Sequence, residues 1–116
     1  MLSKNRRIPR KLIEKILKEG KTVRGRNLFL KYSLNPGKPA SFAFIISSKT
    51  VKKAVLRNKL KRRGRAIIFN FLPEIKDGYS VLIFFEKGSV EMKFAELKQE
   101  IRSLFQKAGL IKGICL

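Results

Sequence analysis

The sequence predicts a mixed α+β fold, with elements in the order α, β, β, α, β, α, in a single domain that covers residues 1–116. Three observations favour this class. Apolar residues recur at helical spacing in three segments, strand-like apolar runs fill three others, and glycine and proline separate them. With 116 residues and 44% apolar composition, the chain is long enough for one hydrophobic core and too short for two.

The first half of the chain contains one expected helix and two expected strands. Apolar positions in residues 10–19 have helical spacing, and Gly20 ends the segment. Residues 27–34 alternate between apolar and polar positions, as in a strand, and residues 41–47 form a second apolar strand. Because a turn at residues 35–39 separates these strands, we expect them to pair as a hairpin.

A long helix, a buried strand and a final helix are expected in the second half. Residues 50–71 carry apolar side chains and Gly64 on one stripe near a 3.6-residue period, and Pro73 follows. Residues 79–86 are almost continuously apolar, which suits a buried strand. Residues 92–108 form the last helix, which Gly109 closes. Its expected core face comprises Phe94, Leu97, Ile101, Leu104 and Phe105.

The charge of the chain indicates a polyanionic partner. Lys and Arg number 28 against 8 Asp and Glu, a formal net charge of +20. Fourteen of the cations lie between Glu19 and Glu74, an interval without any acidic residue. Self-repulsion of this size favours a nucleic acid as the usual neighbour. No apolar run approaches the roughly 18 residues of a membrane span, and the polar start is unlike a secretory signal, so we expect a cytoplasmic protein without a membrane partner.

The missing residue types limit the chemistry. The chain has no histidine and a single cysteine, Cys115, which excludes a disulfide framework, a cysteine-rich zinc site and a nuclease of the histidine type. A carboxylate-metal nuclease stays formally open, but most of the acids look like helix-surface partners for lysines. We therefore expect no metal held by the protein alone.

The central helix carries a cationic face. Arg57, Lys61 and Arg65 recur every four residues, and Asn58 and Arg62 lie on the adjoining stripe. At 1.5 Å per residue, Arg57 to Arg65 spans roughly 12 Å, enough to meet more than one phosphate. Guanidinium groups can bind phosphate oxygens with two hydrogen bonds each. The alternative is a merely solvated basic face, since most basic runs indicate little more than affinity for polyanions.

The residues of this helix favour a specific RNA-binding role over a merely solvated basic face. Residues 57–65, Arg-Asn-Lys-Leu-Lys-Arg-Arg-Gly-Arg, resemble the Arg-Asn-x-x-Lys-Arg-x-x-Arg signature of the bacterial ribonuclease P protein component family at every specified position. Upstream, Ser48 and Lys49 precede Ala54 and Val55 with the family's spacing. The expected element order is also that of the family, so the resemblance covers nearly the whole chain.

The resemblance implies a compact sandwich, similar to ribosomal proteins, with a left-handed βαβ crossover against the usual rule. It implies an accessory subunit of an endoribonuclease that removes the 5′ leader of precursor tRNA, in which a catalytic RNA performs the metal-assisted hydrolysis and the protein supplies no catalytic residues. The partners would be that RNA, in a 1:1 complex, and precursor tRNA, with no small-molecule substrate. The cofactor would be Mg²⁺, bound mainly by the RNA.

Two groups of site residues follow from the resemblance. Contacts to the catalytic RNA would come from Lys49, Lys53, Arg57, Asn58, Lys59, Lys61, Arg62 and Arg65. A cleft for the single-stranded leader would involve Ile13, Leu17, Lys31, Tyr32, Phe44 and Ile46. The family usually has aromatic residues at the first two of these positions, so base stacking there is weakened. A simple core role is the alternative for Ile13 and Leu17. Core positions are expected for Phe29, Phe42, Phe69, Phe84 and Phe85.

The signature segment departs from the family at two further points. Arg63 and Gly64 replace bulky apolar residues, and glycine costs about 1 kcal/mol relative to alanine inside a helix. Either Gly64 lets the helix approach the sheet closely or the helix bends there. Thr50 stands where a second lysine is expected, which removes one phosphate contact.

Other functions stay open at this stage. A general RNA-binding or ribosomal protein would share the charge and the fold class. A DNA-binding module is less favoured because no helix-turn-helix spacing is evident. A protein-only metal nuclease is the least favoured.

Overall fold

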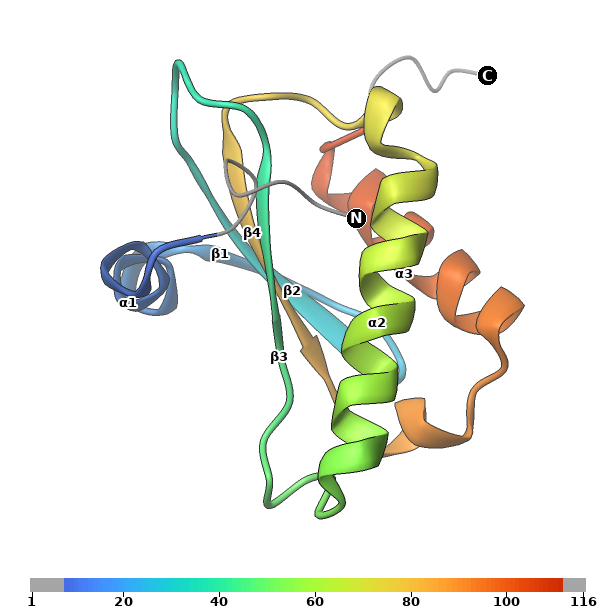
Figure 1. Ribbon diagram of the computed structural model, residues 1–116. Coiled ribbons are helices and arrows are strands. Elements are labelled where there is room, and N and C mark those ends of the chain that lie inside the picture. The colour runs from blue at the N-terminus through green and yellow to red at the C-terminus, as the bar shows by residue number, and fades with distance from the viewer. Residues whose placement is uncertain (1–7, 112–116) are drawn as a thin grey trace.

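A computed structural model describes residues 8–111, and Cys115 lies outside this range. Four strands form one sheet, with α1 on one face and α2 and α3 on the other (Figure 1). This three-layer arrangement confirms the predicted α+β sandwich. The elements are α1 (Arg10–Glu19), β1 (Lys21–Arg24), β2 (Leu28–Leu34), β3 (Ser41–Ile45), α2 (Ala54–Asn70), β4 (Tyr79–Phe85) and α3 (Phe94–Ala108), with short 3₁₀ helices η2 (Leu72–Glu74) and η3 (Lys87–Glu91).

The strand order is β1-β2-β4-β3, so the predicted hairpin of β2 and β3 is wrong. β2 pairs with β4 antiparallel and β3 pairs with β4 parallel. The physical reason lies in β4 itself. Its continuous apolar run is buried on both faces of the sheet, and a strand of that kind is central, with a neighbour on each edge. β4 therefore separates the two strands that follow each other in the sequence.

The connection from β3 through α2 to β4 is left-handed. Both strands run downward in Figure 1, β3 lies in front, and α2 rises on the right before the chain returns to β4 behind. Seen from α2 with the strands pointing up, the chain moves to the left, opposite to the common hand. This confirms the expectation drawn from the family resemblance.

Element boundaries differ from the predictions mainly around α2. This helix begins at Ala54 and not at Thr50, because the amides of Thr50 and Val51 bond to the carbonyl oxygen of Ser47 in a turn. The short strand β1 was not predicted, since its sequence is polar and only Val23 packs against the core. Phe94, expected on the core face of α3, is 41% exposed because it is the first residue of the helix.

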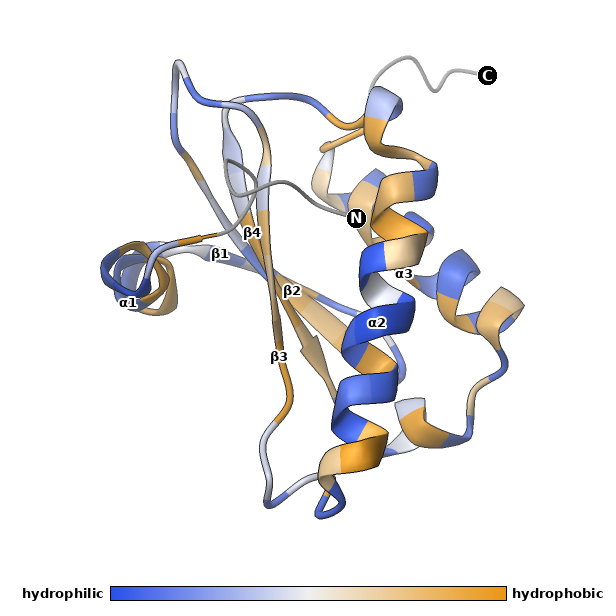
Figure 2. Cartoon of the chain, in the orientation of Figure 1, coloured by the Kyte–Doolittle hydropathy of each residue, from blue (hydrophilic) through white to orange (hydrophobic). Residues whose placement is uncertain are grey.

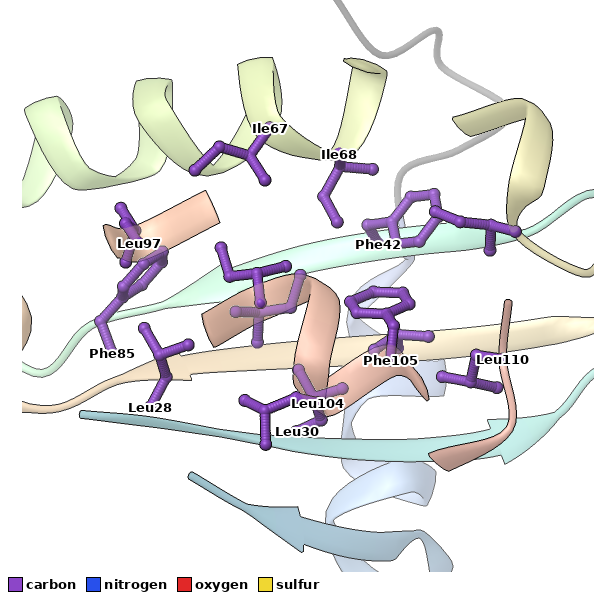
Figure 3. Close-up of a cluster of buried hydrophobic side chains, with 14 of the residues drawn as sticks. Leu28, Leu30, Phe42, Ile67, Ile68, Phe85, Leu97, Leu104, Phe105 and Leu110 are labelled. Atoms are coloured by element: carbon purple, nitrogen blue, oxygen red, sulfur yellow. The ribbon is translucent and has the colours of Figure 1, made fainter. Parts of the chain in front are cut away.

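Two hydrophobic clusters hold the layers together. The larger lies between the sheet and the pair α2 and α3, where Phe42, Phe71 and Phe105 pack with aliphatic residues of all these elements (Figure 3). The smaller lies under α1, where Ile16 packs with Leu82 of β4. Figure 2 shows the consequence for α2, whose side away from the sheet is mostly hydrophilic.

An ion pair ties η2, which follows α2, to α3. The two terminal nitrogens of Arg102, Nη2 and Nη1, donate to the Glu74 carboxylate at 2.6 and 3.2 Å, and the Arg102 guanidinium lies over the ring of Phe71. These hydrogen bonds hold the pKa of Glu74 below its ordinary value and raise the pKa of Arg102. Both side chains are partly exposed, so the pair orients the helix end more than it stabilises the fold.

At Gly64, α2 lies close against side chains of the sheet. A Cβ atom at this position would lie 2.6 and 2.8 Å from two ring carbons of Phe44 and 3.2 Å from the ring of Phe85. The helix runs unbroken from Ala54 to Asn70. Close approach, and not a bend, is therefore the reason for this glycine.

We expect Gly64→Ala to lower the free energy of unfolding by about 1 kcal/mol. The gain of up to about 1 kcal/mol in helix propensity is outweighed by overpacking, which typically costs about 1–3 kcal/mol. Urea denaturation measures the loss, and the double variant with Phe44→Leu should be more stable than the sum of the single changes predicts. A Gly64→Ala protein more stable than the parent would contradict this packing.

Candidate nucleic-acid interface

The buried stripe of α2 determines which of its side chains face solvent. Leu60, Gly64, Ile67 and Ile68 are buried against the sheet. The cations on the opposite side are exposed or half-buried, as the amphipathic pattern predicted. This outward set, which we call the α2 face, comprises Arg57, Asn58, Lys59, Lys61, Arg62 and Arg65.

Arg57 differs from the other members of the α2 face because its side chain is engaged with the protein itself. Its Nη1 atom donates to the carbonyl oxygens of Val51 and Lys52, at 2.8 and 2.9 Å. These bonds hold the segment before α2 against the first turns of the helix. Arg57 therefore shapes the interface, while its remaining N–H groups stay available to a ligand.

The remaining cations of the α2 face form no ion pair with any of residues 8–111. The ion pair of Glu74 and Arg102 lies elsewhere, between η2 and α3. Arg63 is a cation of α2 that does not belong to the α2 face. It donates to the carbonyl oxygen of Met92 and so helps to dock α2 onto the segment before α3. Unpaired like charges four residues apart destabilise a helix mildly, so an anionic ligand would relieve the repulsion.

Lys49 and Lys53 extend this positive charge beyond the N-terminus of α2. Both are exposed, and they line a cavity of about 630 Å³ between the segment before α2 and η3. Lys52 and Lys87 line it as well, together with Glu91. The eight residues predicted to contact the catalytic RNA thus lie together, along α2 and just before it.

The six residues predicted for the leader cleft do not lie together. Ile13 and Lys31 belong to the α1 side of the sheet, where Ile13 packs on the smaller cluster and Lys31 pairs with Leu82. Leu17, on α1, is 44% exposed. Tyr32, Phe44 and Ile46 belong instead to the cluster under α2 and α3.

The expectation of a single cleft lined by all six is therefore wrong. The sequence already contained the reason, because Lys31 and Tyr32 are adjacent in one strand and adjacent residues point to opposite faces. Phe44 packs on Gly64 and its ring lies 6.2 Å from that of Phe85, a core position. Ile46 is 9% exposed, and is also core.

Two phenylalanines expected in the core lie half-buried on the α1 side of the sheet. The rings of Phe29 and Phe84 stack at 4.5 Å with an interplanar angle of 4°. Arg24, the neighbour of Phe29 on β1, places its guanidinium 5.0 Å from the ring centre of Phe29. Both faces of this ring are thus covered from the two neighbouring strands, so Phe29 stabilises the sheet and offers no free face to a base.

The described residues contain no group of three His, Cys, Asp or Glu side chains that could hold a metal ion. In the same part of the chain, no helix is long and apolar enough to cross a membrane. The Glu and Asp carboxylates are spread over several elements. The candidate site is therefore a surface of positive charge supplied with hydrogen-bond donors.

The α+β sandwich with a cationic helix facing outward defines a small basic protein whose α2 face is suited to a polyanion. The family profile described as Ribonuclease P matches residues 2–109, and the chain belongs to this family.

Curated relatives agree with this assignment. The ribonuclease P protein component of Microcystis aeruginosa is 42% identical over 78 residues, which cover 67% of this chain and 64% of the relative. The match thus spans slightly less than two thirds of that protein's length. The component of a Synechocystis species is 33% identical over 97 residues, covering 83% of this chain and 78% of the relative.

Solved structures show the same fold. The RNase P protein of Staphylococcus aureus superposes with a TM-score of 0.83 at 20% identity, covering 92% of this chain and 98% of the other. The protein of Thermotoga maritima gives a TM-score of 0.80 at 23% identity, with the same coverage of both chains. The similarity therefore extends over nearly the whole chain.

The double role of Arg57 gives a testable prediction. Arg57→Lys keeps the charge, but its side chain is one atom shorter and its ammonium does not reach the place of Nη1 beside the Val51 and Lys52 carbonyls, so we expect a loss of about 1 kcal/mol in the free energy of unfolding. Arg62→Lys is the matched control and should leave stability unchanged, because Arg62 is exposed. Equal unfolding midpoints in urea for the two variants would show that Arg57 has no structural role.

Proposed function

We propose that this protein is the accessory subunit of a ribonuclease P ribonucleoprotein, in which it binds the catalytic RNA through the α2 face and assists removal of the 5′ leader from precursor tRNA. The observation that carries the proposal is the set of signature side chains, Arg57, Asn58, Lys61, Arg62 and Arg65, which α2 directs away from the core. Their charge and spacing suit the phosphates of a folded RNA.

Each kind of side chain on the α2 face has its own task in this proposal. The arginines donate paired hydrogen bonds to phosphate oxygens, and the lysines supply mobile point charges. Asn58 is neutral, and its amide can donate to one RNA group and accept from another. It therefore contributes to selection among RNAs, which charge alone does not provide.

In this proposal the hydrolysis is performed by the RNA. The protein has no histidine, and the described residues bring no metal-binding carboxylate group together. Because these ligand groups are missing, the proposal assigns the metal ion mainly to phosphates of the RNA, and not to the protein. Mg²⁺ bound there would supply a water of lowered pKa for attack on the phosphodiester bond. The contribution of the protein is to lower the phosphate repulsion that opposes binding of precursor tRNA and metal.

The leader is proposed to bind on the α1 side of the sheet, beside Leu17 and Lys31. Leu17 is an exposed apolar side chain and Lys31 a cation, so this side combines an apolar contact with a phosphate contact. Tyr32, Phe44 and Ile46 are not part of the proposal, because they lie on the other face of the sheet. We propose a 1:1 complex with the catalytic RNA in the cytoplasm.

The direct test is reconstitution with the cognate catalytic RNA. Cleavage of precursor tRNA is followed at limiting magnesium, with and without the protein, and with the protein alone. We expect the protein to raise the cleavage rate of the RNA and to show no cleavage by itself. Cleavage by the protein alone would reveal a protein-only nuclease, and no stimulation would leave a basic RNA-binding protein without a role in tRNA processing.

A substitution at Asn58 separates this function from general RNA binding. We expect Asn58→Ala to weaken binding of the catalytic RNA about tenfold and binding of an arbitrary structured RNA much less, because the lost hydrogen bonds are specific while the charge is unchanged. Filter binding at one salt concentration measures both affinities. Equal losses on the two RNAs would favour the general RNA-binding alternative.

A further inference from the structure

Phe69 is an aromatic side chain that α2 presents to solvent. It is 55% exposed, although the sequence suggested a core position. Its neighbours Ile67 and Ile68 are fully buried and already anchor this turn of the helix to the sheet. No ring contact or cation-π contact involves Phe69 within residues 8–111, so both faces of its ring are free of aromatic and cationic partners in that range.

The position of Phe69 continues the α2 face. Asn58, Arg62, Arg65 and Phe69 are separated by four, three and four residues. At about 100° per residue these positions fall within an arc of roughly 60°, and they span about 16 Å along the helix. Figure 2 shows that this side of α2 is otherwise mostly hydrophilic. The ring therefore stands in line with the side chains proposed to contact RNA.

A free aromatic ring in a row of cations matches the chemistry of unpaired bases. Bases stack on aromatic side chains while neighbouring cations bind the flanking phosphates. A single exposed apolar residue needs no explanation in general. The alignment with Arg62 and Arg65 is what distinguishes Phe69 from the exposed Phe94 on α3. Phe29 offers a useful contrast, since Arg24 and Phe84 already cover its ring.

We propose that Phe69 is a base-stacking site, on which an unpaired base of the RNA partner lies when the α2 face binds the flanking phosphates. The proposal rests on the proposed RNA-binding function and deepens it, because it adds base contact to a surface otherwise defined by charge. The base could belong to the catalytic RNA or to precursor tRNA, and both sources supply the same chemistry.

A tryptophan reporter tests the contact directly. The chain has no tryptophan, so Phe69→Trp introduces a single tryptophan at the site, which is excited selectively over the two tyrosines, and Phe94→Trp serves as the matched control on α3. The probes are the catalytic RNA alone, precursor tRNA alone and inorganic polyphosphate, a polyanion without bases. We expect one of the RNAs to quench the fluorescence of the Phe69→Trp variant and polyphosphate to leave it unchanged, while the Phe94→Trp variant responds to none of them. The RNA that quenches identifies the source of the base.

Affinity measurements complete the test. We expect Phe69→Ala to weaken binding of the quenching RNA about fivefold or more, with an unchanged salt dependence, because stacking and not charge is lost. Phe69→Tyr should restore most of the affinity, and Phe94→Ala should match the parent protein. The urea midpoint should not fall in Phe69→Ala, since the removed side chain is mostly exposed.

Three results would overturn the proposal. The first is equal RNA affinity for Phe69→Ala and the parent, and the second is an equal fluorescence response of Phe69→Trp to polyphosphate and RNA. The third is a signal from Phe69→Trp that follows protein concentration without RNA, which would indicate self-association. The proposed function is judged separately by stimulation of precursor tRNA cleavage. A parent protein that stimulates cleavage, with a Phe69→Ala variant that binds as well as the parent, would reject the stacking site alone.

Discussion

The packing of α2 against the sheet is the constraint on which the rest of the structure depends. The helix connects two parallel neighbouring strands, β3 and β4, and buries Leu60, Ile67 and Ile68 on them. Because one side of the helix packs against the core, its cations can lie only on the opposite side. The packing thus gathers cations that repel one another on one surface. The apolar core supplies the free energy that holds these like charges together.

Two contacts near α2 determine how this surface is oriented. Gly64 lets the helix backbone approach Phe44, and Arg57 bonds to the carbonyls of the preceding segment. Both features fix the direction of the helix and the position of its first turn relative to the sheet. A rigid helix presents its side chains with little loss of conformational entropy on binding, which favours recognition of a folded RNA over loose attraction to any polyanion.

Local patterns in the sequence predicted most of the helices and strands, but they did not predict which strands pair with one another. The bounds of α1 and the buried stripe of α2 follow from helical spacing, which is a local property. The place of β4 between β2 and β3 depends on contacts far apart in the chain, so the predicted hairpin was wrong. The left-handed crossover came from the family resemblance alone. Strand alternation could have separated Lys31 from Tyr32, whereas the exposure of Phe69 depends on how α2 sits on the sheet.

The central claim is that the cations of α2, and not the general charge of the protein, bind the catalytic RNA. The most direct measurement is the salt dependence of that affinity for two variants, each with four cations replaced by glutamine. The first lacks Lys59, Lys61, Arg62 and Arg65, and the second lacks Lys11, Lys15, Lys98 and Lys107. The account predicts that the logarithmic slope falls by about 0.7 for each α2 cation removed and hardly changes in the second variant. Equal losses in both variants would contradict it.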